Sequence, residues 1–389
     1  MKFSSFRPLS CVLLACAGVG QFGWAPAQTA ATDTPAAQTP AGPAASAWVD
    51  PIGAPAEVMP LAAQSLLLGV ARSGDRFVAV GARGDVLLSD DGRAWRQAAV
   101  PTRMTFTAVA AVDAQLWAVG HEGVIAHSAD GGEHWELQRQ DPWKAPAADD
   151  NAAQDSHQGV PLLGVLFTDI HHGYAVGAYS LALKTTDGGA TWQPLTVAAK
   201  SKADADDTAA EPAGAKGKHG EAQTFTQDEL KLGQEATPHL NAIARTGSGA
   251  LFIVGERGSA FRSRDDGASW QRLQLPYDGS MFGVIGYEAD HVLAFGLRGH
   301  VYESSDLGEH WTQVQTGTEL SLMGGVALPG GGGAIVGANG IVLVRTHAGD
   351  ALKSYVDDSA GIIATVIPFA DDGTLLIAGE NGISLFLPK

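Results

Sequence analysis

Short apolar runs that end in a glycine-bracketed turn recur along most of this chain. Seven segments share the pattern Gly-x-x-Gly or a close variant after an apolar strand; their first turn glycines are Gly81, Gly120, Gly177, Gly255, Gly296, Gly337 and Gly379. Most of these glycines are about 41 residues apart, and two longer spacings match polar inserts near 141–158 and 196–239. Four short strands fit into such a unit, which is the size of one β-propeller blade.

A second signature, Ser/Thr-x-Asp-x-Gly-x-x-Trp, begins eight residues after the turn glycine. Clean copies occupy 128–135, 185–192, 263–270 and 304–311, a shortened copy occupies 89–95, and the copy at 345–352 has lost its Ser, Asp and Trp. Asp accepts backbone N–H groups within a tight turn, Gly supplies a positive φ, and Trp packs between neighbouring sheets. The signature resembles the Asp-box of sialidases and related propellers, and we assign it a structural role.

The pattern predicts an all-β fold: a seven-bladed β-propeller of four-stranded antiparallel blades over residues 48–389, its ring closed by an N-terminal strand. In the fourth unit we expect strands at 240–245, 251–255, 260–263 and 270–275, and we expect the first inner strand at 66–71. Only three strands are recognisable in the last unit. We therefore expect residues 46–50, which contain Trp48, to supply its outer strand.

The N-terminus has the features of an export signal over residues 1–27. Lys2 and Arg7 precede an apolar stretch, and Ala25-Pro26-Ala27 fits signal-peptidase cleavage. We expect an exported, periplasmic or lumenal protein with an Ala/Pro-rich disordered linker at 28–47 and no transmembrane segment. The alternative is a lipid anchor at Cys16, because Leu13–Cys16 resembles a lipobox.

Composition excludes several classes of protein. The chain has 49 glycines and only 17% charged residues, which is unlike a coiled coil. Its net charge of −17 disfavours nucleic-acid binding over the whole surface. Both cysteines, Cys11 and Cys16, lie in the signal, so cleavage after Ala27 would exclude disulfides, thiolate catalysis and Cys-ligated zinc.

The antiparallel order of strands predicts which face can bind. The boxes join third to fourth strands and lie on one face, whereas the Gly-x-x-Gly turns, the blade-to-blade connections and both inserts share the other. Loops on a rigid scaffold are where binding sites usually lie. The residue before the second turn glycine is Arg83, Arg257 or Arg298 in three repeats and Glu122, Asn339 or Asn381 in three others, whereas the equivalent residue Tyr179 precedes Ser180.

We expect the three arginines to belong to a ring of turn positions around the channel mouth, where they form a positive, partner-binding patch suited to carboxylates or phosphates. The alternative is that they are solvated turn residues paired with local acids such as Glu256.

Catalytic, cofactor and metal signatures are missing from the sequence. There is no H-E-x-x-H, G-x-S-x-G or G-K-[ST] motif. His121 with Glu122, and His171 with His172, lack a third ligand at metal-binding spacing. We therefore assign no catalytic, cofactor-binding or metal-ligating residue. A carbohydrate-active propeller with paired carboxylates stays as the alternative, although the Arg-Ile-Pro motif of sialidases is missing.

The stretch GYAVGAYSLALKTTDGGATWQPL (173–195), within the repeats of 48–389, resembles the photosystem II stability/assembly factor family. The resemblance implies a non-enzymatic propeller that binds nascent membrane-protein subunits through one face, where an arginine patch is implicated. By turn position, Arg83, Arg257 and Arg298 could match. Similar proteins in bacteria without photosystems look like periplasmic partners of membrane complexes such as exporters. The long acidic insert and the Ala/Pro linker depart from the family.

The resulting prediction is an exported, monomeric assembly or stability factor for a membrane protein complex, with a protein partner and no nucleic acid. The alternative function is that of a sialidase-like glycoside hydrolase or a lyase. The inserts carry two further expectations, a short helix at 227–235 and a contact or anchoring role for Trp143.

Overall fold

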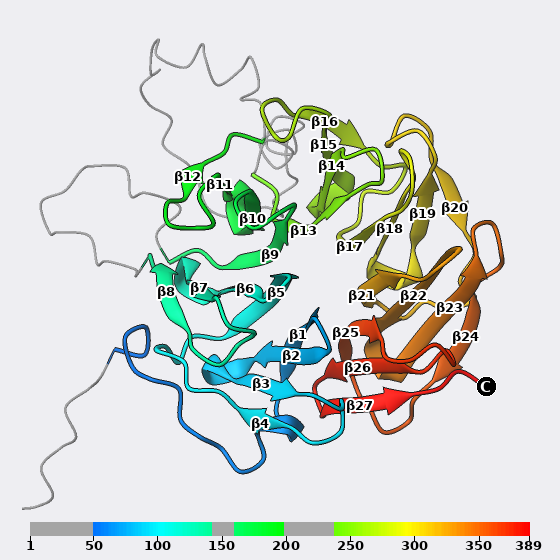
Figure 1. Ribbon diagram of the computed structural model, residues 1–389. Helices are drawn as coiled ribbons and strands as arrows, with labels where there is room; N and C mark the ends of the chain where they lie inside the picture. The colour runs from blue at the N-terminus through cyan, green and yellow to red at the C-terminus, as the bar shows by residue number, and fades with distance from the viewer. Residues whose placement is uncertain (1–49, 142–158, 198–236) are drawn as a thin grey trace, which may run out of the picture. The chain divides into compact units, whose positions relative to one another are not determined.

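The computed structural model describes residues 50–141, 159–197 and 237–389. Their strands form seven antiparallel sheets, six with four strands and one with three. Each inner strand contacts the inner strands of the two neighbouring sheets, and the first inner strand contacts the last. The sheets therefore form the closed seven-bladed ring seen in Figure 1, which confirms the predicted fold.

The first four blades run in chain order. Blade 1 comprises β1 (Leu67–Ser73), β2 (Arg76–Gly81), β3 (Val86–Ser89) and β4 (Arg96–Gln97). Blade 2 comprises β5 (Phe106–Val112), β6 (Gln115–Gly120), β7 (Ile125–Ser128) and β8 (Glu136–Arg139). Blade 3 comprises β9 (Leu162–Phe167), β10 (Gly173–Gly177), β11 (Ala182–Thr185) and β12 (Gln193–Pro194). Blade 4 comprises β13 (Leu240–Arg245), β14 (Leu251–Gly255), β15 (Ser259–Ser263) and β16 (Gln271–Gln274), within one residue of the predicted limits.

The last three blades complete the ring. Blade 5 comprises β17 (Met281–Gly286), β18 (Val292–Gly296), β19 (Val301–Ser304) and β20 (Thr312–Val314). Blade 6 comprises β21 (Leu322–Ala327), β22 (Gly331–Gly337), β23 (Ile341–His347) and β24 (Lys353–Val356). Blade 7 comprises β25 (Ile363–Pro368), β26 (Leu375–Gly379) and β27 (Gly382–Phe386).

Short 3₁₀ segments make the turns between second and third strands in the first six blades: η2 (Ala82–Gly84), η3 (His121–Gly123), η4 (Ala178–Ser180), η6 (Glu256–Gly258), η7 (Leu297–Gly299) and η8 (Ala338–Gly340). The first turn glycine permits a close approach to the inner strand. A Cβ on Gly296 would collide with the carbonyl oxygen of Ser280, which precedes β17. The described residues contain no helix that is long and apolar enough to span a membrane.

The core is divided into seven apolar clusters, one at each junction between neighbouring blades. Because every sheet is covered on both faces, second strands such as β14 and β18 are buried along their whole length. The box tryptophans join these clusters, and each packs between its own blade and the preceding one; they are Trp95, Trp135, Trp192, Trp270 and Trp311, with Leu352 in the sixth repeat. This confirms their predicted packing role.

Hydrogen bonds within each box explain why its residue types recur. In blade 5, Ser304 Oγ donates to Asp306 Oδ1 at 2.8 Å and accepts the Gly308 N–H at 2.7 Å. Asp306 Oδ1 also accepts the His310 N–H at 2.9 Å. Equivalent bonds hold the boxes of blades 2, 3 and 4. The aspartate therefore organises a turn, as the sequence predicts.

These box hydrogen bonds predict a loss of stability in acid. Hydrogen bonds from His134 to Asp130, from Thr191 to Asp187 and from Ser269 to Asp265 lower the pKa of each carboxyl to about 2. A depressed folded-state pKa contributes stability above the ordinary pKa, and this contribution is lost as the pH falls through the folded value. We expect the melting temperature of the wild-type protein to drop between about pH 4 and pH 2. The drop should be smaller in Asp265→Asn, which lacks one of these carboxyl groups. Equal pH dependence in the two proteins would contradict this origin.

The segment that leads into β1 contacts the last blade through η1. A Cβ on Gly382 of blade 7 would collide with the carbonyl oxygen of Ala63, in η1 (Ala62–Gln64) four residues before β1. In blades 1, 4 and 5, a Cβ on the second turn glycine would collide in the same way with the carbonyl oxygen of the residue four positions before the next inner strand. These residues are Thr102, Tyr277 and Thr318. The segment around Ala63 thus occupies the position of a blade-to-blade connection and leads into β1.

Upstream of η1, the described residues 50–61 pack on blade 1. The Pro51 carbonyl accepts the Arg103 N–H at 2.9 Å, and the Ala56 N–H donates to Val100 O at 2.9 Å. Ile52 and Ala54 are buried, so apolar contact directs this segment to the start of the connection between blades 1 and 2. Asp50 lies in no strand, and the other residues of the outer strand predicted at 46–50 lie outside the described residues. Trp48, Trp143 and the helix expected at 227–235 lie outside the described residues.

Candidate functional site

The ring has two chemically distinct faces. We call the face that carries the Gly-x-x-Gly turns and the blade-to-blade connections the turn face, and the opposite one the box face. Both gaps in the described chain fall in connections of the turn face, between β8 and β9 and between β12 and β13. The turns join second and third strands, so they lie one strand outward from the channel. This differs from the position predicted from the sequence, which is around the channel mouth.

Backbone geometry sets the exposure of the turn side chains. Arg83, Arg257 and Arg298 have φ values of 55°, 55° and 56°, and all three are exposed. This left-handed conformation is uncommon for non-glycine residues. It is imposed by the tight 3₁₀ turn, in which the His300 N–H, for example, donates to Leu297 O at 3.3 Å. The turn therefore presents its central residue to solvent.

Tyr277 lies between two of these arginine turns. Its hydroxyl donates to Leu297 O at 3.4 Å, beside Arg298. Its own carbonyl oxygen lies against Gly258, beside Arg257. The Tyr277 ring stacks on His300 at a centroid distance of 4.0 Å. The connection from blade 4 to blade 5 thus holds an aromatic ring between two turns that each carry an exposed arginine.

A second aromatic contact extends this surface to blade 3. Tyr179 packs edge-on against His239 at a centroid distance of 4.8 Å, and His239 Nδ1 lies 3.6 Å from the Glu256 carboxylate. Glu256 therefore pairs with His239, and the expected alternative, in which it pairs with an arginine, is not what the structure shows. We call the continuous surface over blades 3 to 5 the tyrosine–arginine strip, made of Tyr179, His239, Arg257, Tyr277, Arg298 and His300.

Arg83 lies apart from the strip, because blade 1 is three positions away from both blade 4 and blade 5 in the ring. Its neighbour Asp85 is fully buried and accepts hydrogen bonds from Ser65 Oγ and Gln97 Nε2, each at 2.8 Å. Burial raises the pKa of Asp85, and the Ser65 hydrogen bond and the charge of Arg83 partly oppose that rise. The charge of Arg83 thus acts on a buried local acid.

The charge around the strip is mixed. Asp278 and Glu319 are exposed in the connections that follow blades 4 and 5. Within the described part of the chain, neither Arg257 nor Arg298 forms an ion pair with them. Two exposed arginines that have no ion-pair partner among the described residues, in turns next to Tyr277, form a surface that can bind carboxylates and extended peptides, since Tyr and Arg dominate binding hot spots.

The other cavities have fewer side chains that are available for binding or catalysis. The channel holds a cavity of about 240 Å³ lined by inner-strand residues such as Gly69, Thr107 and Asn241, and none of its lining residues is ionisable. A cavity of about 340 Å³ on the box face contains Asp130, His134 and Glu136, but its aspartate is already bound within a box. Over residues 50–141, 159–197 and 237–389, no group of three His, Cys, Asp or Glu is arranged to hold a metal ion.

Sequence reasoning located the turn arginines but not their aromatic neighbours. Tyr277, His239 and His300 lie in connections or at strand starts that carry no periodic signal. One usable hint was that Tyr277 lies in the connection between the two arginine-bearing repeats. The structure shows how these residues from separate repeats come together.

Comparison with known proteins supports the fold. No family model matches the chain, and no curated protein matches it in sequence. Solved structures are similar at low identity. One is YCF48 bound to D1 peptide, with 17% identity and a TM-score of 0.57, covering 84% of this chain and 94% of that one. Another is YCF48 from Cyanidioschyzon merolae, with 15% identity and a TM-score of 0.57, covering 85% and 98%.

A propeller of a different kind is equally similar in shape. The WD40 β-propeller domain of Doa1 has 12% identity and a TM-score of 0.57, and the match covers 87% of this chain and 97% of that domain. At such identities the similarity shows the β-propeller fold alone.

Proposed function

We propose that this chain is a non-enzymatic, exported propeller that binds a protein partner through its turn face and acts as an assembly or stability factor for a membrane protein complex. The partner is a membrane-protein subunit that presents an extended segment with an acidic group. The function is steric and electrostatic: the rigid ring holds that segment while the complex forms. Export rests on the signal sequence at residues 1–27, which lies outside the described residues.

The observation that carries this proposal is the position of Tyr277 between the turns that carry Arg257 and Arg298. Its ring is fixed by the hydroxyl bond to Leu297 O and by stacking on His300, so it loses little conformational entropy when a partner binds. The two arginines can each pair with a carboxylate while the partner's backbone passes over the ring. Arg83, across the ring, would contribute to a partner that covers more of the turn face.

The comparisons agree with a role in protein binding. One similar propeller, YCF48, has been solved with D1 peptide bound, and the WD40 propeller of Doa1 belongs to another protein with the same architecture. These similarities support the coarse function of a protein-binding propeller. The membrane-complex role is our extension of it from the resemblance of the repeats.

Charge reversal within the strip tests the proposal. We expect Arg257→Glu/Arg298→Glu to weaken partner capture by about 100-fold or more, since loss of a hot-spot arginine typically costs about 2 kcal/mol or more and a like charge adds repulsion. The partner is first identified by tagged co-purification from the periplasm, and its affinity is then measured by surface plasmon resonance. Arg83→Glu is expected to have a smaller effect because it lies apart from Tyr277.

Arg272→Glu is the matched control, because Arg272 is exposed on β16 of the same blade but lies outside the strip. All variants should keep the wild-type melting temperature. Unchanged capture by the double variant would refute the strip as the binding site. Turnover of a polysaccharide or sialoside that depends on one carboxylate would establish the carbohydrate-active alternative instead.

A further inference from the structure

Among the described residues, the third strand of blade 7 is paired along one edge only. The corresponding strands β3 and β15 are buried along their whole length, and β7, β11 and β19 have only one half-buried residue each. In β23 the four residues that pair with β24 include one half-buried residue, and the last two residues of the strand are exposed. In β27, four of the five residues are half-buried. The difference arises because, among the described residues, β27 pairs with β26 on one side only, whereas the other third strands also pair with a fourth strand.

A hollow lies beside this edge, at the junction of blades 6 and 7 on the box face. Its volume is about 480 Å³, and its apolar lining includes Leu328, Val344, Tyr355, Phe369 and Leu387. At five of the other six junctions a box tryptophan packs at this level, and Leu352 does so at the sixth. The hollow therefore corresponds to the site of a seventh box side chain.

Leu387 lies where the box of the seventh repeat would begin. It stands at the position of the box serine, eight residues after Gly379. Its counterparts in the other blades are buried; they are Ser89, Ser128, Thr185, Ser263, Ser304 and Arg345. Leu387 is 38% exposed. Leu387 is thus a large, exposed apolar side chain at a position whose counterparts are buried in the six other blades.

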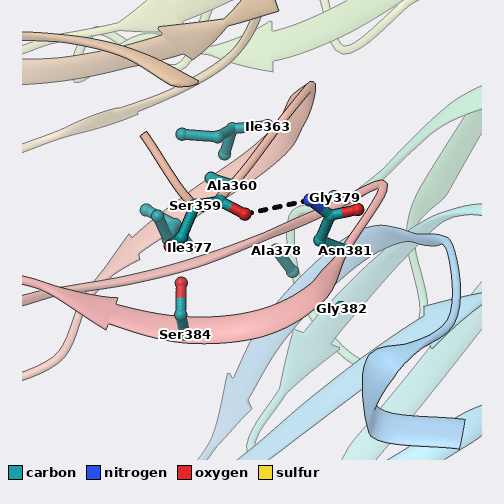
Figure 2. Close-up of a pocket in the computed structure, with 9 residues that line it drawn as sticks. All are labelled: Ser359, Ala360, Ile363, Ile377, Ala378, Gly379, Asn381, Gly382 and Ser384. Carbon is teal, nitrogen blue, oxygen red and sulfur yellow. Dashed lines mark hydrogen bonds between the residues drawn. The ribbon is translucent and has the colours of Figure 1, made fainter. Parts of the chain in front are cut away.

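The strand itself is held firmly at its turn end. Asn381 Nδ2 donates to Ser359 O at 2.9 Å, which ties the β26–β27 turn to the connection from blade 6. Figure 2 shows this bond beside a cavity of about 60 Å³, with Ser384 of β27 on the cavity wall. Ile383 and Leu385 pack on the opposite face, against blade 1. This bond and this packing hold β27 in place in the blade.

Charge at the rim of the hollow indicates the chemistry of its occupant. Asp371 and Asp372 lie on the β25–β26 turn, and both are exposed. Asp372 accepts the Thr374 N–H, and Asp371 has no ion-pair partner in the described part of the chain. Arg72, also at the rim, already pairs with Asp75 at 3.6 Å. The rim is thus acidic, and the interior is apolar.

We propose that blade 7 binds an extended segment of another polypeptide as its fourth strand, antiparallel to β27. The segment places a tryptophan or another large apolar side chain in the hollow and a basic residue near Asp371. Backbone hydrogen bonds along the free edge supply affinity, and the hollow supplies specificity, as in β-strand addition to other sheets. This site is separate from the tyrosine–arginine strip, and it gives the ring a second means of holding a partner.

The chain's own fourth blade provides a probe of the right chemistry. A fluorescein-labelled peptide with the sequence of residues 263–275 carries a complete box, Trp270, and the basic Arg272. We expect it to bind the full-length protein in fluorescence anisotropy and to slow amide exchange at Ile383–Phe386. Replacing its Trp270 by Ala should weaken binding by about 10- to 100-fold, the value of one large buried apolar side chain.

Variants of the protein complete the test. Leu387→Glu should weaken peptide binding by a similar factor, whereas Ile170→Glu, also exposed on the box face, should leave it unchanged. Equal affinity for the Ala peptide, or for Leu387→Glu, would overturn the proposal. So would a dimer abolished by Leu387→Glu, which would assign the edge to a second copy. Binding seen only after deletion of residues 28–49 would assign it to the chain's own N-terminal segment and also overturn it.

Discussion

Replacing Arg345 by methionine is expected to lower the free energy of unfolding by about 3–5 kcal/mol, because the substitution removes one partner of a buried ion pair. The Arg345 side chain is 1% exposed, and its Nη2 lies 2.7 Å from Glu303 Oε1. The guanidinium also lies 5.3 Å from the centre of the Tyr287 ring. Methionine would leave the Glu303 carboxylate poorly solvated and without its cation.

Glu303 has a second partner within its own blade, blade 5. His291 Nε2 lies 2.6 Å from Glu303 Oε1, and the His291 ring stacks on Tyr287 at 4.8 Å. The hydrogen bond with His291, together with Arg345, lowers the pKa of Glu303 to about 2 against the opposing effect of burial. Its contribution to stability is therefore present above the ordinary glutamate pKa and is lost as the pH falls toward 2.

The double variant Arg345→Met/Glu303→Leu is the control. Replacing both members of a buried pair by apolar residues is often neutral, so the double variant should recover most of the stability lost by the single one. Urea denaturation at pH 7, with the slope of the transition compared between proteins, measures each loss. A single variant within about 1 kcal/mol of wild type would show that solvent compensates Glu303.

This ion pair illustrates what the repeat pattern can and cannot predict. The sequence shows that the sixth box has lost its serine, aspartate and tryptophan, and that Arg345 stands at the serine position. The structure shows that Leu352 fills the tryptophan site while Arg345 reaches the glutamate of the previous blade. In the preceding repeat, Glu303 lies one position before the box serine, Ser304. Aligning the fifth and sixth repeats would therefore have placed the charges of Glu303 and Arg345 at the same junction between blades.

Local rules predicted the blades well because their determinants repeat. The turn glycines and box residues act within a few residues of their own positions, and the fourth unit's strands begin and end within one residue of expectation. Contacts between non-repeating segments were not predictable in this way. The apolar residues Ile52 and Ala54 bury against blade 1, although a missing strand in blade 7 suggested another course for the N-terminal chain. The tyrosine–arginine strip also depends on connections that differ from blade to blade.

Replacing Trp117 by alanine is expected to cost about 3–5 kcal/mol of unfolding free energy, the usual range for deleting a buried tryptophan. Trp117 of β6 is fully buried. Its ring stacks on Phe167 of β9 at a centroid distance of 3.5 Å and an interplanar angle of 9°. Its Nε1 donates to Gly188 O, in the box of blade 3, at 2.9 Å. The substitution therefore removes an aromatic contact and a hydrogen bond that both cross from blade 2 to blade 3.

Trp117→Phe separates these two contributions. Phenylalanine keeps a ring over Phe167, and Gly188 O still accepts a hydrogen bond from Gln138 Nε2 at 3.1 Å. We therefore expect a loss of about 1–2 kcal/mol for Trp117→Phe, measured by urea denaturation beside the exposed control Leu61→Ala. Equal losses in the two Trp117 variants would assign the effect to the hydrogen bond and contradict a packing origin. Because Trp117 belongs to the scaffold, folded Trp117→Ala protein should still capture the partner, unlike the strip variants.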